Sequence, residues 1–89
     1  MSDEIKEIVE HYGKETQTFV AMEELSELSQ ALSKSMRGED ARRQILEEMA
    51  DVYITLAEQR YIHDISLGEV LTVMEIKLNR MKERMHESI

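Results

Sequence analysis

The chain has 89 residues, with 11 Lys and Arg against 19 Asp and Glu, so it forms one small and strongly acidic domain over residues 1–89. Its net charge of −8 argues against nucleic-acid and anionic membrane partners, because both kinds of surface require clustered cations. Cysteine is absent, which excludes disulfides and thiolate metal sites. An acidic start at residues 1–4 and the lack of an apolar run of about 18 residues predict a soluble, untargeted, cytoplasmic protein.

The composition predicts an all-α fold, because Pro is absent, Gly occurs 3 times and only 4% of residues are aromatic. The first predicted helix carries apolar residues at helical spacing and ends at Gly13, which acts as a C-terminal cap. The second runs from about Thr16 to Met36, and Gly38 follows it as a breaker.

The third predicted helix begins after Asp40, a good N-cap, and continues to about Tyr61. The spacing of Ser66 and Glu69 predicts a capping box at the start of a fourth helix. That helix carries a heptad-like apolar seam: Leu67, Leu71, Met74, Leu78, Met81 and Met85. The apolar faces of the three long helices exceed what one small hairpin can cover, so we expect a helical bundle built by an obligate oligomer.

The second and third helices echo each other, because residues 21–28 and 45–52 have the same pattern of acidic and apolar positions. The helical repeat places Glu24 and Glu27 at the edge of the apolar face of the second helix. The echo places Glu48 and Asp51 in the same way on the third. An antiparallel hairpin centred at residues 37–38 would set Glu24 opposite Asp51 and Glu27 opposite Glu48.

Four like charges that converge in a partly desolvated place need neutralisation by protons or by a cation. Oxygen-only ligands favour Mg²⁺, with Mn²⁺ as the alternative, whereas zinc and a di-iron centre need histidines that lie elsewhere, at His11, His63 and His86. The ordinary alternative is a solvated helix face, and we expect that role for five of the other helical carboxylates: Glu4, Glu7, Glu10, Glu58 and Glu87.

The acidic pattern, Glu23-Glu24-x-x-Glu27 followed by Glu48-x-x-Asp51, resembles the signature of the MazG-like, all-α nucleoside triphosphate pyrophosphohydrolases. The resemblance covers most of the chain and extends to the Lys77-Leu78-Asn79-Arg80 segment of the last helix.

The resemblance implies Mg²⁺-dependent hydrolysis of a nucleoside triphosphate to the monophosphate and pyrophosphate, carried out by a dimer or tetramer. It also implies that Glu24, Glu27, Glu48 and Asp51 are the metal ligands. Glu23, or Glu27 if it is loosely bound, is the candidate to accept a proton from the attacking water.

The last predicted helix carries a basic stripe formed by Lys77, Arg80 and Arg84. This stripe either clamps substrate phosphates or is an ordinary solvated helix face, and the resemblance favours the clamp. Lys34 and Arg37 are further candidates for phosphate binding, although both could instead complement the helix dipole.

Contacts to the base or sugar are less well defined in the sequence. His11 and Gln17 are candidates, but a histidine before a glycine is more often a cap or a surface residue. The aromatic residues are more often packing residues than stacking platforms: Tyr12, Phe19, Tyr53 and Tyr61.

Two other classes of function compete with the hydrolase. One is a non-catalytic helical assembly module that binds metal or nucleotide, which release of pyrophosphate would exclude. The other is a coiled-coil adaptor, which Mg²⁺ binding would exclude.

Overall fold

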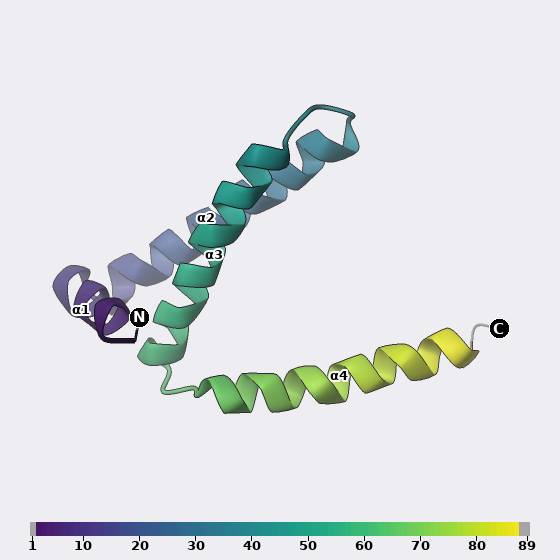
Figure 1. The fold of residues 1–89 in the computed structure, drawn as a ribbon. Coiled ribbons are helices and arrows are strands. Elements are labelled where there is room, and N and C mark those ends of the chain that lie inside the picture. Colours follow the sequence, from purple (N-terminus) through teal and green to yellow (C-terminus); the bar gives the residue numbers. More distant parts are fainter. Residues whose placement is uncertain (1, 88–89) are drawn as a thin grey trace.

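Every regular element in residues 2–87, the part of the chain that the computed structural model describes, is an α-helix (Figure 1). The helices are α1 (Ser2–Tyr12), α2 (Lys14–Met36), α3 (Arg42–Ile62) and α4 (Leu67–Glu87). The prediction of an all-α chain with about four helices is confirmed. None of these helices is long and apolar enough to cross a membrane.

Gly13 joins α1 to α2 in a single residue. Its φ of 94° lies in the left-handed region that favours glycine, its N–H donates to the Val9 carbonyl at 2.8 Å, and its own carbonyl accepts from the Gln17 N–H at 3.1 Å. The predicted cap is therefore confirmed. The same residue also serves as the N-cap of α2, so α2 begins at once with Lys14 rather than near Thr16.

The long helices α2 and α3 form an antiparallel hairpin (Figure 1). Its turn lies at the predicted place, with Gly38 at a left-handed φ of 86°. The prediction of Asp40 as the N-cap is wrong, because α3 is capped by Ala41, whose carbonyl accepts from the Ile45 N–H at 2.9 Å without help from a side chain. Ala41 is buried, so its methyl group is packed against the rest of the chain at the start of α3.

Small and polar side chains make up the buried part of the hairpin. Ala21 and Ala31 are buried on α2, while Thr55 and Glu58 are buried on α3. The larger buried apolar residues, Ile5 and Val9, come from α1, which packs on both long helices at the open end of the hairpin. Most large apolar side chains of the hairpin remain exposed: Phe19, Met22, Leu25, Leu32, Leu46, Met49, Tyr53 and Leu56.

The connection from α3 to α4 is held by local hydrogen bonds on both sides. At the end of α3 the Ile65 N–H donates to the Arg60 carbonyl at 2.9 Å, and Asp64 takes a left-handed φ of 53°. The predicted capping box is confirmed, because the Ser66 N–H donates to Glu69 Oε2 at 2.7 Å and the Glu69 N–H to Ser66 Oγ at 3.1 Å. α4 then runs away from the hairpin, and none of its residues is buried (Figure 1).

Candidate metal centre

Three carboxylates from the two long helices meet midway along the hairpin. Glu24 and Glu27 project from α2 and Glu48 projects from α3, and one carboxylate oxygen from each lies within 4.8 Å of the others. We call these three residues the acidic group. Its members lie where the echo of the two helices and the central turn predicted that they would meet.

The predicted facing pairs are also found. Asp51 lies next to Glu24, and Glu27 lies next to Glu48. Each neighbour is close enough to raise the pKa of its partner. The antiparallel register that the sequence indicates is therefore the register of the structure.

Two oxygens of the acidic group lack a partner. Glu24 Oε2 and Glu48 Oε2 are buried, and neither has a hydrogen-bond partner within residues 2–87. A buried carboxylate oxygen without a donor is costly, since it has lost its water and received nothing in exchange. These oxygens are available to a proton or to a cation.

The pKa values of the acidic group also reflect the lack of donors or positive charge around its carboxylates within residues 2–87. Burial, followed by the charges of Asp51 and Glu27, raises the pKa of Glu24 from 4.5 to about 7. Burial also raises the pKa of Glu48, and the adjacent carboxylate of Glu27 adds to this effect. Protons therefore compete with any cation for Glu24 near neutral pH, and the raised pKa of Glu48 acts in the same direction.

The other two acidic residues of the sequence pattern lie outside the acidic group. Asp51 is exposed at its rim, close enough to raise the pKa of Glu24. Glu23 is exposed on α2 and does not join the group. Their roles as a fourth ligand and as a proton acceptor stay predictions.

The donor set fits a hard divalent cation. The acidic group offers only carboxylate oxygens, and Glu24 and Glu48 each have a buried oxygen without a hydrogen-bond partner in residues 2–87; Mg²⁺ prefers oxygen donors of this kind. No histidine belongs to the group in the described part of the chain, which disfavours zinc.

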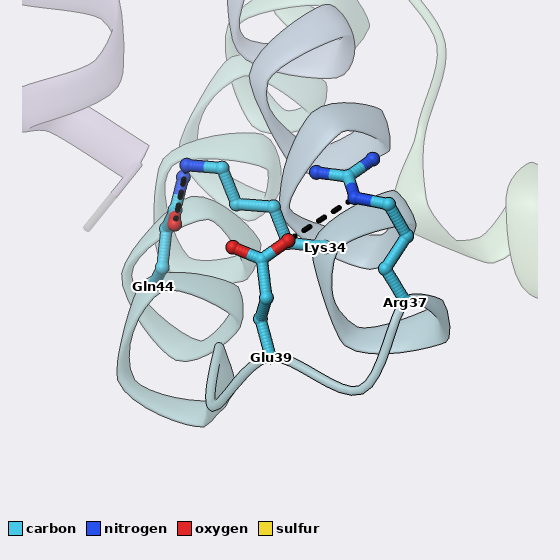
Figure 2. Close-up of polar contacts among 4 residues, drawn as sticks. All are labelled: Lys34, Arg37, Glu39 and Gln44. Carbon is cyan, nitrogen blue, oxygen red and sulfur yellow. Dashed lines mark hydrogen bonds and ion pairs between the residues drawn. The ribbon is translucent and has the colours of Figure 1, made fainter.

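The candidate phosphate-binding residues are divided between two places. Lys34 lies on α2 two helical turns beyond Glu27 and on the same side of the helix, and its Nζ donates to Gln44 Oε1 at 3.3 Å (Figure 2). Arg37 is engaged with Glu39 Oε2 at 3.1 Å at the turn (Figure 2). The remaining candidates lie on α4, which does not bring them to the acidic group of its own chain: Lys77, Arg80 and Arg84.

Gln17 and Glu58 depart from the sequence expectations. The sequence makes Gln17 a candidate for contact with the nucleotide and predicts a solvated Glu58, but in the structure their exposed fractions are 6% and 2%. Gln17 Nε2 donates to both carboxylate oxygens of Glu58, at 3.1 and 3.3 Å. The signal that could have revealed this pair is its position, since the two residues are equally distant from the centre of the turn.

His11 and the aromatic residues lie at the surface. The His11 ring packs edge to face against Tyr12, with centroids 4.6 Å apart. Tyr12, Phe19 and Tyr53 are exposed, so the expectation that they pack is not met within a single chain. Tyr61 is also exposed, and its hydroxyl donates to Glu10 Oε1 at 3.0 Å.

Comparison with models of protein families, with curated proteins and with solved structures finds no match for this chain. The resemblance to the MazG-like hydrolases therefore rests on the residues of the motif. Of these, the structure brings Glu24, Glu27 and Glu48 together, with Asp51 at the rim.

Proposed function

We propose that the protein is a Mg²⁺-dependent nucleoside triphosphate pyrophosphohydrolase of the MazG-like kind, acting on ribo- or deoxyribonucleotides in the cytoplasm. The observation that carries the proposal is the pair of buried, unpartnered oxygens on Glu24 and Glu48, next to the carboxylate of Glu27. A purely structural acidic cluster would have its buried oxygens paired with donors.

Glu24, Glu27, Glu48 and Asp51 would hold the cation. Bound there, Mg²⁺ would neutralise the charge of the polyphosphate and polarise its P–O bonds. The four side chains come from two helices fixed in register, so they present their oxygens without a large rearrangement. This preorganisation matters because phosphoryl transfer depends mainly on positioning and on charge neutralisation.

The reaction consumes one water, breaks a P–O–P bridge, and yields the monophosphate and pyrophosphate. The proton of the attacking water needs an acceptor near the cation. Glu23 is the candidate, or Glu27 if it binds the cation only loosely, because each has a carboxylate that solvent reaches.

Lys34 is the candidate phosphate-binding residue that lies on the hairpin itself, on the same helix as Glu24 and Glu27. Its half-buried side chain is turned toward Gln44, and it lies on the side of α2 that also carries Glu27. Lys77, Arg80 and Arg84 contact substrate phosphates only if an α4 from another subunit reaches the site. Their proposed role as a phosphate clamp therefore requires assembly.

The shape of the chain supports a homo-oligomer, either a dimer or a tetramer. The accessible surface is 7470 Å², whereas a compact monomer of 10.4 kDa exposes about 5,400 Å². The radius of gyration is 16.2 Å, against about 12 Å for a compact chain of this length. An excess of about 2,000 Å² per chain falls within the range that obligate interfaces bury.

Incubation of the purified protein with a panel of canonical and modified nucleoside triphosphates and Mg²⁺ tests the proposal. We expect pyrophosphate and monophosphate in equal amounts, and no product from Glu24→Gln. Glu4→Gln, which removes an exposed carboxylate on α1, is the matched control and should leave turnover unchanged. Mg²⁺ binding without pyrophosphate release from any nucleotide would instead identify a non-catalytic assembly module.

A further inference from the structure

The contact between α2 and α3 has little that would fix how the two helices slide along each other. The side chains that it buries fully are small or polar, whereas Leu28, Ile45 and Val52 are only half-buried and most other large apolar side chains of both helices are exposed. Alanines such as Ala21 and Ala31 allow helices to approach closely, but their small side chains make few specific contacts that would resist sliding. The register of the two helices must therefore be set mainly by hydrogen bonds, because these depend on the exact position of both partners.

The two ends of the hairpin differ in this respect. At the closed end the short connection between Met36 and Arg42 ties the helices together covalently. At the open end only non-covalent contacts hold α2 to α3, and there the Gln17–Glu58 pair is buried, with the Gln59 amide donating to Thr18 Oγ1 at 3.4 Å beside it.

We infer that the buried Gln17–Glu58 pair is a latch that closes the open end of the hairpin and sets the register in which the acidic group forms. Gln17 and Glu58 lie at the same distance from the turn as each other, as do the facing members of the acidic pattern. A slide of either helix would leave a nine-tenths buried carboxylate and a buried amide without partners, which is a large penalty for a small displacement. Buried polar pairs fix register in helical assemblies for this reason.

The role we assign is one of positioning. Gln17 and Glu58 lie about two helical turns from Glu24 and Asp51, so they do not touch the proposed cation. They act through the α2–α3 register, which decides whether Glu24 and Glu27 meet Glu48. This inference rests on the proposed metal site for its functional consequence but not for its structural content.

Exchange of the two side chains tests the latch. Gln17→Glu places two carboxylates against each other in the buried contact, Glu58→Gln keeps an amide pair, and the double variant Gln17→Glu/Glu58→Gln restores an amide–carboxylate pair in the reverse direction. The matched control is Gln30→Glu, which makes the same change at an exposed position of α2.

Two measurements report on these variants. The first is the distance between spin labels on cysteines introduced at the exposed residues Glu15 and His63, with labelled chains diluted by unlabelled protein. The chain has no cysteine of its own, so labelling is specific. The second is the Mg²⁺ dissociation constant at a temperature at which every variant is folded by circular dichroism.

For Gln17→Glu we expect a broadened, longer distance and an Mg²⁺ dissociation constant raised about tenfold, which is the usual cost of disturbing the support of a metal site. The exchanged double variant should recover both, and Glu58→Gln and Gln30→Glu should stay close to the parent. A merely stabilising pair would lower the melting temperature and leave both readouts of the folded protein unchanged.

Parental distances and Mg²⁺ affinity in folded Gln17→Glu would overturn the latch. If Gln17→Glu does not fold, the double variant decides, and its failure to regain the parental distance also overturns the latch. A parent protein that binds no Mg²⁺ would refute the proposed metal site instead, and the distances would still test the latch.

Discussion

Replacing Glu24 by Gln should make the metal-free protein more stable at neutral and alkaline pH while abolishing Mg²⁺-dependent hydrolysis. The folded protein holds the Glu24 carboxyl at a pKa of about 7, against 4.5 for an ordinary glutamate, chiefly because of burial and secondly because of Asp51. Ionisation of this side chain therefore opposes folding, and a neutral amide removes that opposition.

The sign of the pH dependence follows from the proton balance. Between pH 4.5 and about 7 the folded state binds more protons at Glu24 than the unfolded state does, so the free energy of unfolding falls as pH rises. Below this window both states are protonated and Glu24 makes no difference. Above it, the full penalty is present.

The shift in the pKa of Glu24 corresponds to about 3 kcal/mol, and solvent screening at this half-buried site reduces the expected effect to about 1 to 2 kcal/mol. For a chain of this size a gain of 1 kcal/mol raises the melting temperature by about 4 to 8 °C.

Thermal unfolding in the presence of a chelator, at pH 4 and at pH 8, measures this difference. Glu24→Gln should match the parent at pH 4 and exceed it at pH 8, while the exposed-site control Glu4→Gln follows the parent at both values. If Glu24→Gln were less stable than the parent at pH 8 without metal, the carboxylate would be a structural hydrogen-bonding group and the metal-site reasoning would be wrong.

Three further outcomes are expected. Sedimentation or light scattering at low concentration should give an oligomer, and a stable folded monomer would contradict the surface-area reasoning. Lys77→Ala and Arg80→Ala should each lower kcat/KM about tenfold or more with unchanged circular dichroism, assembly and Mg²⁺ affinity, since a charge-assisted phosphate contact is worth about 1.5 to 3 kcal/mol; parental kinetics in both would remove α4 from the site. Mg²⁺ affinity should rise with pH through about 7, because the proton on Glu24 must leave before the metal binds, and titration calorimetry showing the same affinity at pH 6 and pH 8 would argue against Glu24 as a ligand.

Local patterns in the sequence were sufficient for the helices and for the facing of the carboxylates. The capping box at Ser66 and Glu69 and the helix ends at Gly13 and Gly38 depend on neighbouring residues alone, so the sequence predicts them correctly. The meeting of the acidic residues of α2 and α3 was also predictable, because they lie at equal distances from the centre of the turn along the sequence. The starts of two helices were misplaced: α2 begins at Lys14, because Gly13 is also its N-cap, and α3 begins after the buried Ala41 rather than after Asp40.

Tertiary packing decided the features that depend on which helix covers which. Glu58 looks like any surface glutamate in the sequence, yet α3 packs against α2 and α1 at that point and buries it beside Gln17. The direction of α4 could not be predicted either. The apolar seam that begins at Leu67 indicates that one side of the helix is to be buried, but not which surface it packs against. Amphipathic periodicity specifies that a face is to be buried, whereas the identity of the surface that buries it is a property of the whole fold and its assembly.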